Sequence, residues 1–182
     1  MNLKEYQNLA IKKMTERSNS LLDQEDLRKI VLDAPTGSGK TIMMAEILKQ
    51  ISLYNKDRHE ITFLWTAPRN LHYQSLLKLR EYYKKCNTLS CLEFSDLSNN
   101  EILQNEILFL NWESINKKSN IIIRENEKNF YLDKIIENTK KKEKKIILII
   151  DESHHGATTA ISKELIKDLS PDLCIEASAT PV

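Results

Sequence analysis

Two of the three glycines in this 182-residue chain lie in one short segment, Ala34 to Thr41. The segment reads APTGSGKT and matches the phosphate-binding loop G-x-x-x-x-G-K-[ST], except that Ala34 takes the first place. In such a loop backbone N–H groups face phosphate oxygens, the lysine reaches the β- and γ-phosphates and the hydroxyl binds Mg²⁺. A plain strand-to-helix turn is the alternative, but glycine is otherwise almost absent, so its use here indicates a special backbone. The expected phosphate or metal contacts are Pro35, Thr36, Gly37, Ser38, Gly39, Lys40 and Thr41.

Two acidic residues, Asp151 and Glu152, directly follow the aliphatic run 146–150. A phosphate-loop enzyme has its second Mg²⁺ ligand and its water-activating carboxylate at this place. We therefore assign Asp151 to the metal and Glu152 to general-base catalysis, with Lys40 as the third catalytic group. Paired acids at the end of a strand are often only a solvated turn, and it is the loop in the same chain that favours the functional interpretation.

Neighbouring histidines and cysteines do not predict a zinc site. His154 and His155 are adjacent, so on a strand they point to opposite faces and on a helix they diverge by about 100°. Cys86 and Cys91 have no second pair of ligands near them. An odd number of scattered cysteines also argues against a disulfide framework.

Hydrophobic patterning places these residues on alternating strands and helices. Short aliphatic runs without polar alternation are typical of strands buried on both faces of a parallel sheet. The pattern predicts an α/β fold with right-handed crossovers and a site at the carboxyl ends of the strands. Strands are predicted near 30–32, 61–65, 107–110, 146–150 and 174–177, and helices at 3–17, from 42 to 51 and from 71 to 79.

The polar stretch 111–145 reads as an elaborated crossover within one domain. Phe130, Leu132, Ile135 and Ile136 form a helical stripe inside it. The basic run 140–145 is most simply a solvated loop that enters a strand, with a specific basic binding patch as the alternative. A formal net charge of +1 excludes attraction to nucleic acid by bulk electrostatics, so any such site must be local.

Length and hydropathy indicate a single domain without a membrane segment. The 182 residues, 41% of them hydrophobic, suffice for one core. The longest aliphatic run, 146–150, is far shorter than the roughly 20 residues that a membrane helix needs. The first residues lack a signal-peptide pattern, so we expect a cytoplasmic protein.

Four segments, in order, resemble the successive motifs of superfamily 2 helicase-type motors. They are APTGSGKT at 34–41, TAPRN at 66–70, DESHH at 151–155 and SATP at 178–181. Asn111 to Lys117, 124–127 and 149–154 further resemble the restriction (Res) subunit of type III restriction–modification enzymes. The resemblance implies a RecA-like three-layer sandwich, a mostly parallel sheet with helices on both faces, and a DEAD/DEAH-like ATPase that uses ATP and Mg²⁺. In this superfamily an alanine at the first loop position is common, which accounts for Ala34.

By the same resemblance, individual residues acquire expected roles. Gln7 reads the adenine edge and Tyr6 packs nearby, although Lys4 stands where arginine is frequent. Arg69 and Asn70 contact nucleic-acid phosphates. For Arg69 the alternative is a solvated residue at a helix start. Asn111 and Trp112 belong to another strand-contacting motif, with a core position as the alternative for Trp112. Ser178 and Thr180 couple the nucleotide site to strand movement, and His154 faces a second motor domain.

The resemblance also implies what this chain lacks. Residues 1–182 correspond to a single N-terminal RecA-like ATP-binding domain, without the second RecA-like domain, its arginine and the nuclease domain. Because such an arginine is worth roughly 10³ to 10⁵ in rate, we expect nucleotide binding with weak hydrolysis and no translocation by these residues alone. In the parent protein the expected partners are duplex DNA and a modification methyltransferase (Mod) subunit.

Two other functions stay open at this stage. The first is a superfamily 2 motor of another system, such as an RNA helicase or a different defence ATPase. The second is a nucleotide-binding switch module without turnover. ATP turnover with duplex DNA, with RNA and with neither distinguishes the three.

Overall fold

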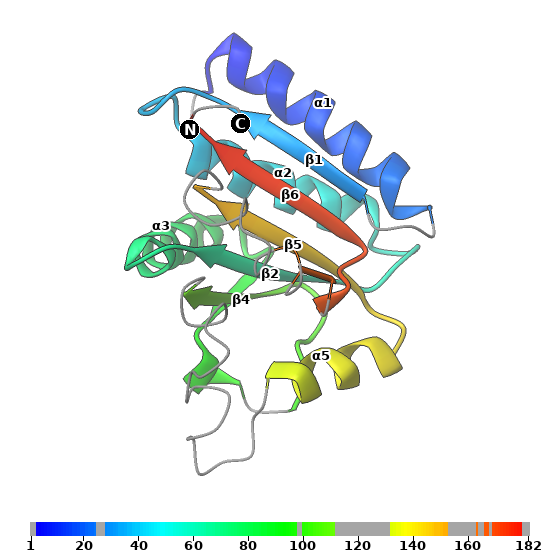
Figure 1. Ribbon diagram of the computed structural model, residues 1–182. Helices are drawn as coiled ribbons and strands as arrows, with labels where there is room; N and C mark the ends of the chain where they lie inside the picture. The colour runs from blue at the N-terminus through cyan, green and yellow to red at the C-terminus, as the bar shows by residue number, and fades with distance from the viewer. Residues whose placement is uncertain are drawn as a thin grey trace.

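One six-stranded sheet, parallel throughout, forms the centre of the protein (Figure 1). The computed structural model describes residues 3–24, 28–97, 100–111, 132–152, 163, 166–167 and 169–179. The strand order is β1-β6-β5-β2-β4-β3. The strands are β1 (Arg28–Asp33), β2 (Ile61–Ala67), β3 (Ser90–Leu92), β4 (Glu106–Asn111), β5 (Lys145–Asp151) and β6 (Leu173–Ser178).

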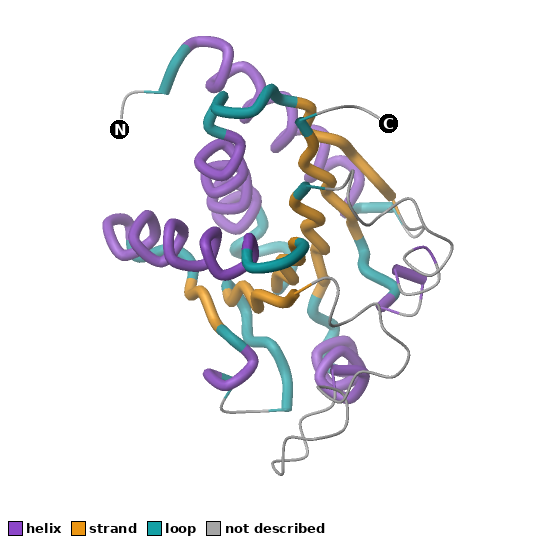
Figure 2. Tube along the Cα trace, turned by 60° about the vertical axis from the view of Figure 1, so that its left-hand side comes forward, coloured by secondary structure: helices purple, strands orange, loops and turns teal. Residues whose placement is uncertain are grey.

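Helices pack on both faces of this sheet, which confirms the RecA-like α/β fold. Three helices pack against one face, where they share a hydrophobic cluster with alternate strand residues, and α5 shares a second cluster on the other face. Figures 1 and 2 show α5 apart from α1, α2 and α3. The helices whose bounds lie within the described ranges are α1 (Glu5–Leu22), α2 (Lys40–Tyr54), α3 (Leu71–Cys86) and α5 (Leu132–Lys141), with a 3₁₀ turn, η1 (Phe94–Asp96).

The central strands are buried on both faces, as their unbroken aliphatic runs predict. In β2, Phe63 and Trp65 belong to the first cluster and Leu64 to the second. The Trp65 ring stacks on that of Phe109 in β4, with 5.5 Å between centroids. Full burial of such side chains stabilises the fold by about 1.5–3 kcal/mol each.

Strand order decides which loops meet. Strand β6 lies between β1 and β5, with Asp33 paired to Ser178 and Asp151 paired to Ala177. The loops that follow β1 and β5 therefore leave the same edge of the sheet, on either side of one strand. This places the phosphate-type loop opposite the acidic pair.

Helix α1 extends beyond its predicted end at residue 17. It continues to Leu22, and both Ser18 and Asn19 are buried. The Asn55 side chain donates from Nδ2 to Asn19 Oδ1 at 2.9 Å, a tertiary contact that local periodicity does not reveal.

Strand β3 and η1 were not predicted, because three-residue elements are too short to show a hydrophobic period. In α3, Leu77 is 49% exposed. Phe130, part of the predicted helical stripe, lies outside the described residues.

The basic run 140–145 is a solvated loop only in part, which corrects the expectation from sequence: Lys142 and Glu143 form an exposed turn before β5, whereas Lys140 and Lys144 have structural partners. Lys140 lies in the last turn of α5, and its Nζ donates to the carbonyls of Leu169 and Ser170. Lys144 is buried and pairs with Glu101 at 2.9 Å. Hydrogen bonds from Lys142 and then Lys144 hold the pKa of Glu101 below its usual value. The run fastens α5 and β5 to neighbouring loops.

Replacement of Lys144 tests this structural role. Lys144→Ala leaves the buried Glu101 with only Lys142, so we expect the free energy of unfolding to fall by about 2 kcal/mol. The matched control is Lys142→Ala, whose side chain is 60% exposed and whose loss should cost about 0.5 kcal/mol. Urea unfolding measures both. Equal effects of the two variants would refute the difference in burial as the cause.

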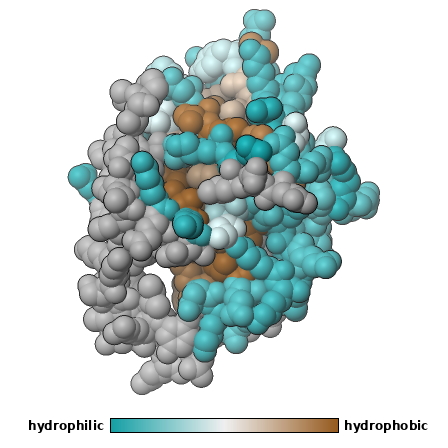
Figure 3. Space-filling model, turned by 45° about the vertical axis from the view of Figure 1, so that its right-hand side comes forward, coloured by the Kyte–Doolittle hydropathy of each residue, from teal (hydrophilic) through white to brown (hydrophobic). Residues whose placement is uncertain are grey.

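Part of the hydrophobic material of the chain reaches the surface. In the edge strand β1, Val31 is 45% exposed. Figure 3 shows hydrophobic surface, in brown, between hydrophilic side chains. Of the helices in the described ranges, none is both long and apolar enough to cross a membrane.

Candidate active site

The loop between β1 and α2 has the backbone of an anion cradle. Gly37 and Gly39 have φ angles of 79° and 87°, which other residues adopt at a cost. In the described part of the chain, the N–H groups of Gly37, Gly39, Lys40 and Thr41 donate no backbone hydrogen bond. The buried Ser38 hydroxyl also has no partner among the described residues. Free N–H groups at a helix start suit a phosphate.

The first turn of α1 lies against this loop. Tyr6 Oη and Gln7 Nε2 both donate to the Ser38 carbonyl, at 3.0 and 2.8 Å. The Gln7 side-chain oxygen accepts the Lys4 N–H at 2.8 Å, so the amide is held at both ends. The structure thus brings Tyr6 and Gln7, proposed from resemblance, to the loop. A Cβ at Gly39 would lie 2.8 Å from Gln7 Nε2, so a larger residue would force the tip of the Gln7 side chain to move.

Alanine substitutions separate the two requirements for glycine. Gly37→Ala meets only the cost of a positive φ, since nothing lies within 4 Å of the added Cβ. We expect it to lower the free energy of unfolding by about 1 kcal/mol. Gly39→Ala also displaces the tip of the Gln7 side chain and breaks its hydrogen bond to the Ser38 carbonyl, so a loss of about 2 kcal/mol is expected. Thermal unfolding of both variants measures the difference, and an equal loss of stability would exclude the Gln7 contact.

Lys40 and the acidic pair meet across β6. Lys40 Nζ, in a buried side chain, lies 3.9 Å from Glu152 Oε1 and donates to the Ala34 carbonyl at 3.2 Å. Glu152 follows the last residue of β5 with a φ of 54°. A buried ammonium is costly unless anions surround it. The group has three N–H donors, so it can bind a phosphate while it keeps its carbonyl partner.

Asp151 is buried at the end of β5. Its Oδ1 accepts the Glu152 N–H at 3.1 Å and its Oδ2 accepts the Ser75 hydroxyl at 3.3 Å. Burial first, and then the charge of Glu152, raise the pKa of Asp151 to about 6, against the opposing effect of the hydrogen bonds and of Lys40. Sequence reasoning missed Ser75, although a polar residue on the apolar stripe of 71–79 is a detectable signal.

Ser178 is buried at the end of β6, between the loop and the acidic pair. Its carbonyl accepts the Ala34 N–H at 3.2 Å. It is therefore in contact with the first residue of the loop, at the strand that separates β1 from β5. Thr180 and His154, the other two expected coupling residues, lie outside the described residues.

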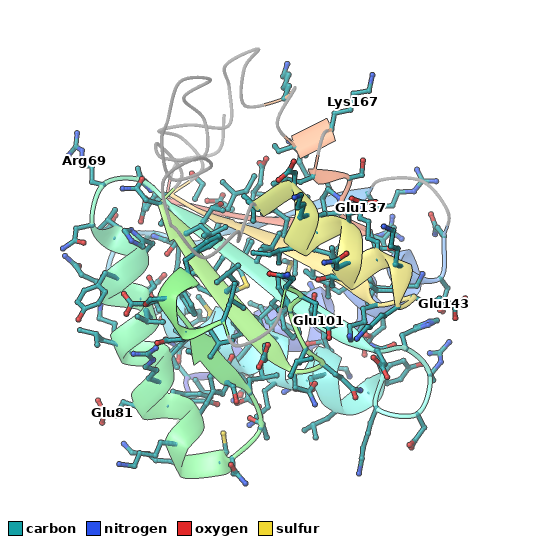
Figure 4. All side chains as sticks on the ribbon, turned by 90° about the horizontal axis from the view of Figure 1, so that it is seen from below. Arg69, Glu81, Glu101, Glu137, Glu143 and Lys167 are labelled. Atoms are coloured by element: carbon teal, nitrogen blue, oxygen red, sulfur yellow. The ribbon has the colours of Figure 1, made fainter. Side chains whose placement is uncertain are left out.

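Arg69 and Asn70 lie in the turn between β2 and α3, both exposed. Figure 4 shows Arg69 pointing outward at the start of α3 and Glu81 further along that helix. The Arg69 carbonyl accepts a bond from Asn111 Nδ2 at 2.9 Å and faces His72 Nδ1 at 3.0 Å, which fixes a residue with a φ of 52°. Among the described residues, no hydrogen bond or ion pair joins Arg69 or Asn70 to the phosphate-type loop. Trp112 lies outside the described residues.

A cleft of about 750 Å³ lies between α2 and α3. Neither Lys40 nor the acidic pair lines it, so it is separate from the charged groups at the carboxyl edge. Its lining consists of Leu3, Ile42, Glu46, Lys49, Lys78, Glu81, Tyr82, Lys85 and Cys86.

The donor set at the carboxyl edge fits Mg²⁺ carried by a polyphosphate. Within the described ranges no three His, Cys, Asp or Glu side chains gather into a metal cage. Mg²⁺ prefers oxygen ligands and is usually held by one or two carboxylates together with substrate phosphates. The Asp151 carboxylate and the Thr41 hydroxyl would be the protein's oxygen ligands, and the N–H groups of the loop would hold the phosphates that supply the others.

A family model described as type III restriction enzyme, res subunit, matches residues 1–182. The chain belongs to this family. Solved structures similar to this Res-family chain include the SWI2/SNF2 ATPase core of Sulfolobus solfataricus with double-stranded DNA, at 20% identity and a TM-score of 0.61 over the whole chain. The type ISP restriction enzyme LlaGI with a DNA substrate mimic has 14% identity over the whole chain and a TM-score of 0.58. The UvsW helicase of bacteriophage T4 has 14% identity over 99% of the chain and a TM-score of 0.53.

At these identities the likeness to solved structures establishes the fold. The Res-family chain covers 32%, 18% and 53% of those three structures in the same order. No curated protein sequence matches it.

Proposed function

We propose that residues 1–182 form one RecA-like motor domain that binds Mg·ATP at the loop between β1 and α2. The observation that carries the proposal is the approach of Lys40 Nζ to Glu152 Oε1, 3.9 Å apart, from loops on either side of β6. A buried cation beside a carboxylate, next to free N–H groups, offers a place for a polyphosphate and its metal.

In the proposed reaction each charged residue has one task. Lys40 and the loop N–H groups stabilise negative charge on the β- and γ-phosphates. Thr41 and Asp151 hold Mg²⁺, which supplies further charge neutralisation when bound. Glu152 accepts a proton from the water that attacks the γ-phosphorus, while the bond from that phosphorus to the bridging oxygen breaks and ADP leaves with the electron pair.

Recognition of adenine is assigned to Gln7. One of its two amide N–H groups is engaged with Ser38, and its oxygen accepts the Lys4 N–H. The amide keeps one N–H and one lone pair for the edge of a base. Tyr6 is half exposed beside it and packs near the same nucleotide.

In the full protein, we propose, this domain drives movement on duplex DNA. Arg69 and Asn70 contact backbone phosphates from an exposed turn, and Trp112 adds a second strand contact. Family membership supports DNA over RNA, as do two similar structures, an ATPase core solved with double-stranded DNA and a restriction-modification enzyme solved with a DNA substrate mimic. His154, Ser178 and Thr180 transmit the state of the nucleotide to a second RecA-like domain, and a nuclease domain and a Mod subunit complete the system.

Calorimetry and turnover assays on the 182-residue chain test this function. We expect one Mg·ADP site per chain, slow ATP hydrolysis and no acceleration by duplex DNA, because the second domain's arginine is not among these residues. Rapid DNA-stimulated turnover would contradict the dependence on a second domain. Stimulation by RNA alone would favour another superfamily 2 motor, and binding by a full-length protein that never hydrolyses ATP would favour a switch module.

A further inference from the structure

Ser75 is a polar residue on the buried face of α3. Its relative exposure is 6%, and Leu76, Leu79 and Tyr83 on the same face belong to the core. A buried hydroxyl costs stability unless it has a hydrogen-bond partner. A serine inside a helix usually finds that partner in the carbonyl one turn earlier.

The partner of this hydroxyl is instead Asp151, at 3.3 Å from Ser75 Oγ to Oδ2. The other carboxylate oxygen, Oδ1, accepts the Glu152 N–H at 3.1 Å. One oxygen of this carboxylate accepts a hydrogen bond from the next residue in the chain, and the other accepts one from α3. The two bonds together fix the plane of the carboxylate. Without Ser75 only the bond from the neighbouring residue would remain to orient Asp151.

We propose that Ser75 is a positioning residue that orients Asp151 for the divalent metal; the inference rests on the proposed function. Groups that hydrogen-bond to metal ligands typically change metal affinity by about 10- to 100-fold when removed. The hydroxyl also joins the metal ligand to α3, whose first residue follows Arg69 and Asn70 directly. Helix α3 is thus connected to both parts of the site. The turn expected to contact DNA leads directly into it, and Asp151 accepts a hydrogen bond from it.

A magnesium titration of nucleotide binding tests the role. Fluorescent mant-ADP is bound to the 182-residue chain while free Mg²⁺ is varied. We expect Ser75→Ala to raise the half-saturating Mg²⁺ concentration about tenfold and to leave mant-ADP affinity in EDTA unchanged. Ser75→Cys keeps the volume but has only a weak donor, and it should show the same shift.

Ser52→Ala is the matched control. Ser52 is also a buried helical serine, and its hydroxyl donates to Asn105 Oδ1 at 2.6 Å, away from the acidic pair. It should lose similar stability without a change in the magnesium titration. In an Asp151→Asn background, Ser75→Ala should cause no further shift, because the carboxylate that it orients is gone.

The outcomes distinguish the inference from the proposed function. A wild-type chain that binds no mant-ADP with Mg²⁺ would overturn both. Wild-type binding together with Mg²⁺ titrations that coincide for Ser75→Ala, Ser75→Cys and Ser52→Ala would overturn the positioning role alone. The same holds if Ser75→Ala shifts the titration equally in the Asp151→Asn background.

Discussion

Lys40→Ala should lower the affinity of the chain for Mg·ADP by about 100-fold or more, measured by calorimetry. The Lys40 ammonium is buried beside the loop N–H groups that have no backbone acceptor among the described residues. Its hydrogen bonds to phosphate would be charge-assisted, and such bonds are stronger than those between neutral groups. A 100-fold loss corresponds to about 2.7 kcal/mol. Because the substitution also removes a buried charge, we expect the fold to persist.

Lys49→Ala is the matched control for this variant. Lys49 lies in the same helix and pairs with Glu46 at 2.6 Å, but it lines the cleft between α2 and α3. Its removal should leave Mg·ADP affinity within about twofold. If Mg·ADP affinity were kept in Lys40→Ala but reduced in Lys49→Ala, the nucleotide would bind in the cleft between α2 and α3 and not at the loop.

Asp151→Asn should have opposite effects on stability and on metal-dependent binding. In the folded protein burial raises the pKa of Asp151 to about 6, from 3.8, so the ionised side chain destabilises the fold at neutral pH. The neutral amide removes this penalty, and we expect the unfolding free energy at pH 7.5 to rise by up to about 3 kcal/mol. The half-saturating Mg²⁺ concentration for nucleotide binding should rise at least about tenfold.

The pH dependence gives the sign of this effect. A raised carboxyl pKa means that the folded state takes up a proton more readily than the unfolded state, so the penalty is full above pH 6 and absent below 3.8. Melting temperatures of wild type and Asp151→Asn should therefore differ at pH 7.5 and converge toward pH 4. Asp33→Asn makes the same charge change at an exposed position at the end of β1. Burial would be refuted as the cause if the difference in melting temperature from wild type did not depend on pH, or if it were equal for Asp151→Asn and Asp33→Asn.

The strands and helices that carry the site were predictable because their signals are local. Aliphatic runs predicted β2, β4 and β5, and the glycine pair marked the turn into α2. Strand order was not readable from such runs. The meeting of Lys40 with Glu152 depends on β6 lying between β1 and β5, a non-local fact that periodicity does not reveal.

Other features could not be predicted because tertiary contacts decide them. The last turn of α1 depends on the bond between Asn19 and Asn55, 36 residues apart. Nothing local distinguishes Lys144 from the solvated lysines next to it, because its partner Glu101 is 43 residues away in the sequence. Ser75 required a partner 76 residues away in the sequence. In each case a polar residue is buried, and its partner is distant in the chain.

A crystal structure of the 182-residue chain with Mg·ADP tests the central claim most directly. We expect β-phosphate oxygens to accept hydrogen bonds from the N–H groups of Gly37, Gly39, Lys40 and Thr41. Lys40 Nζ should contact the phosphate, and the metal should lie between Thr41 and Asp151. Nucleotide bound in the cleft between α2 and α3, or a metal remote from Asp151, would contradict it.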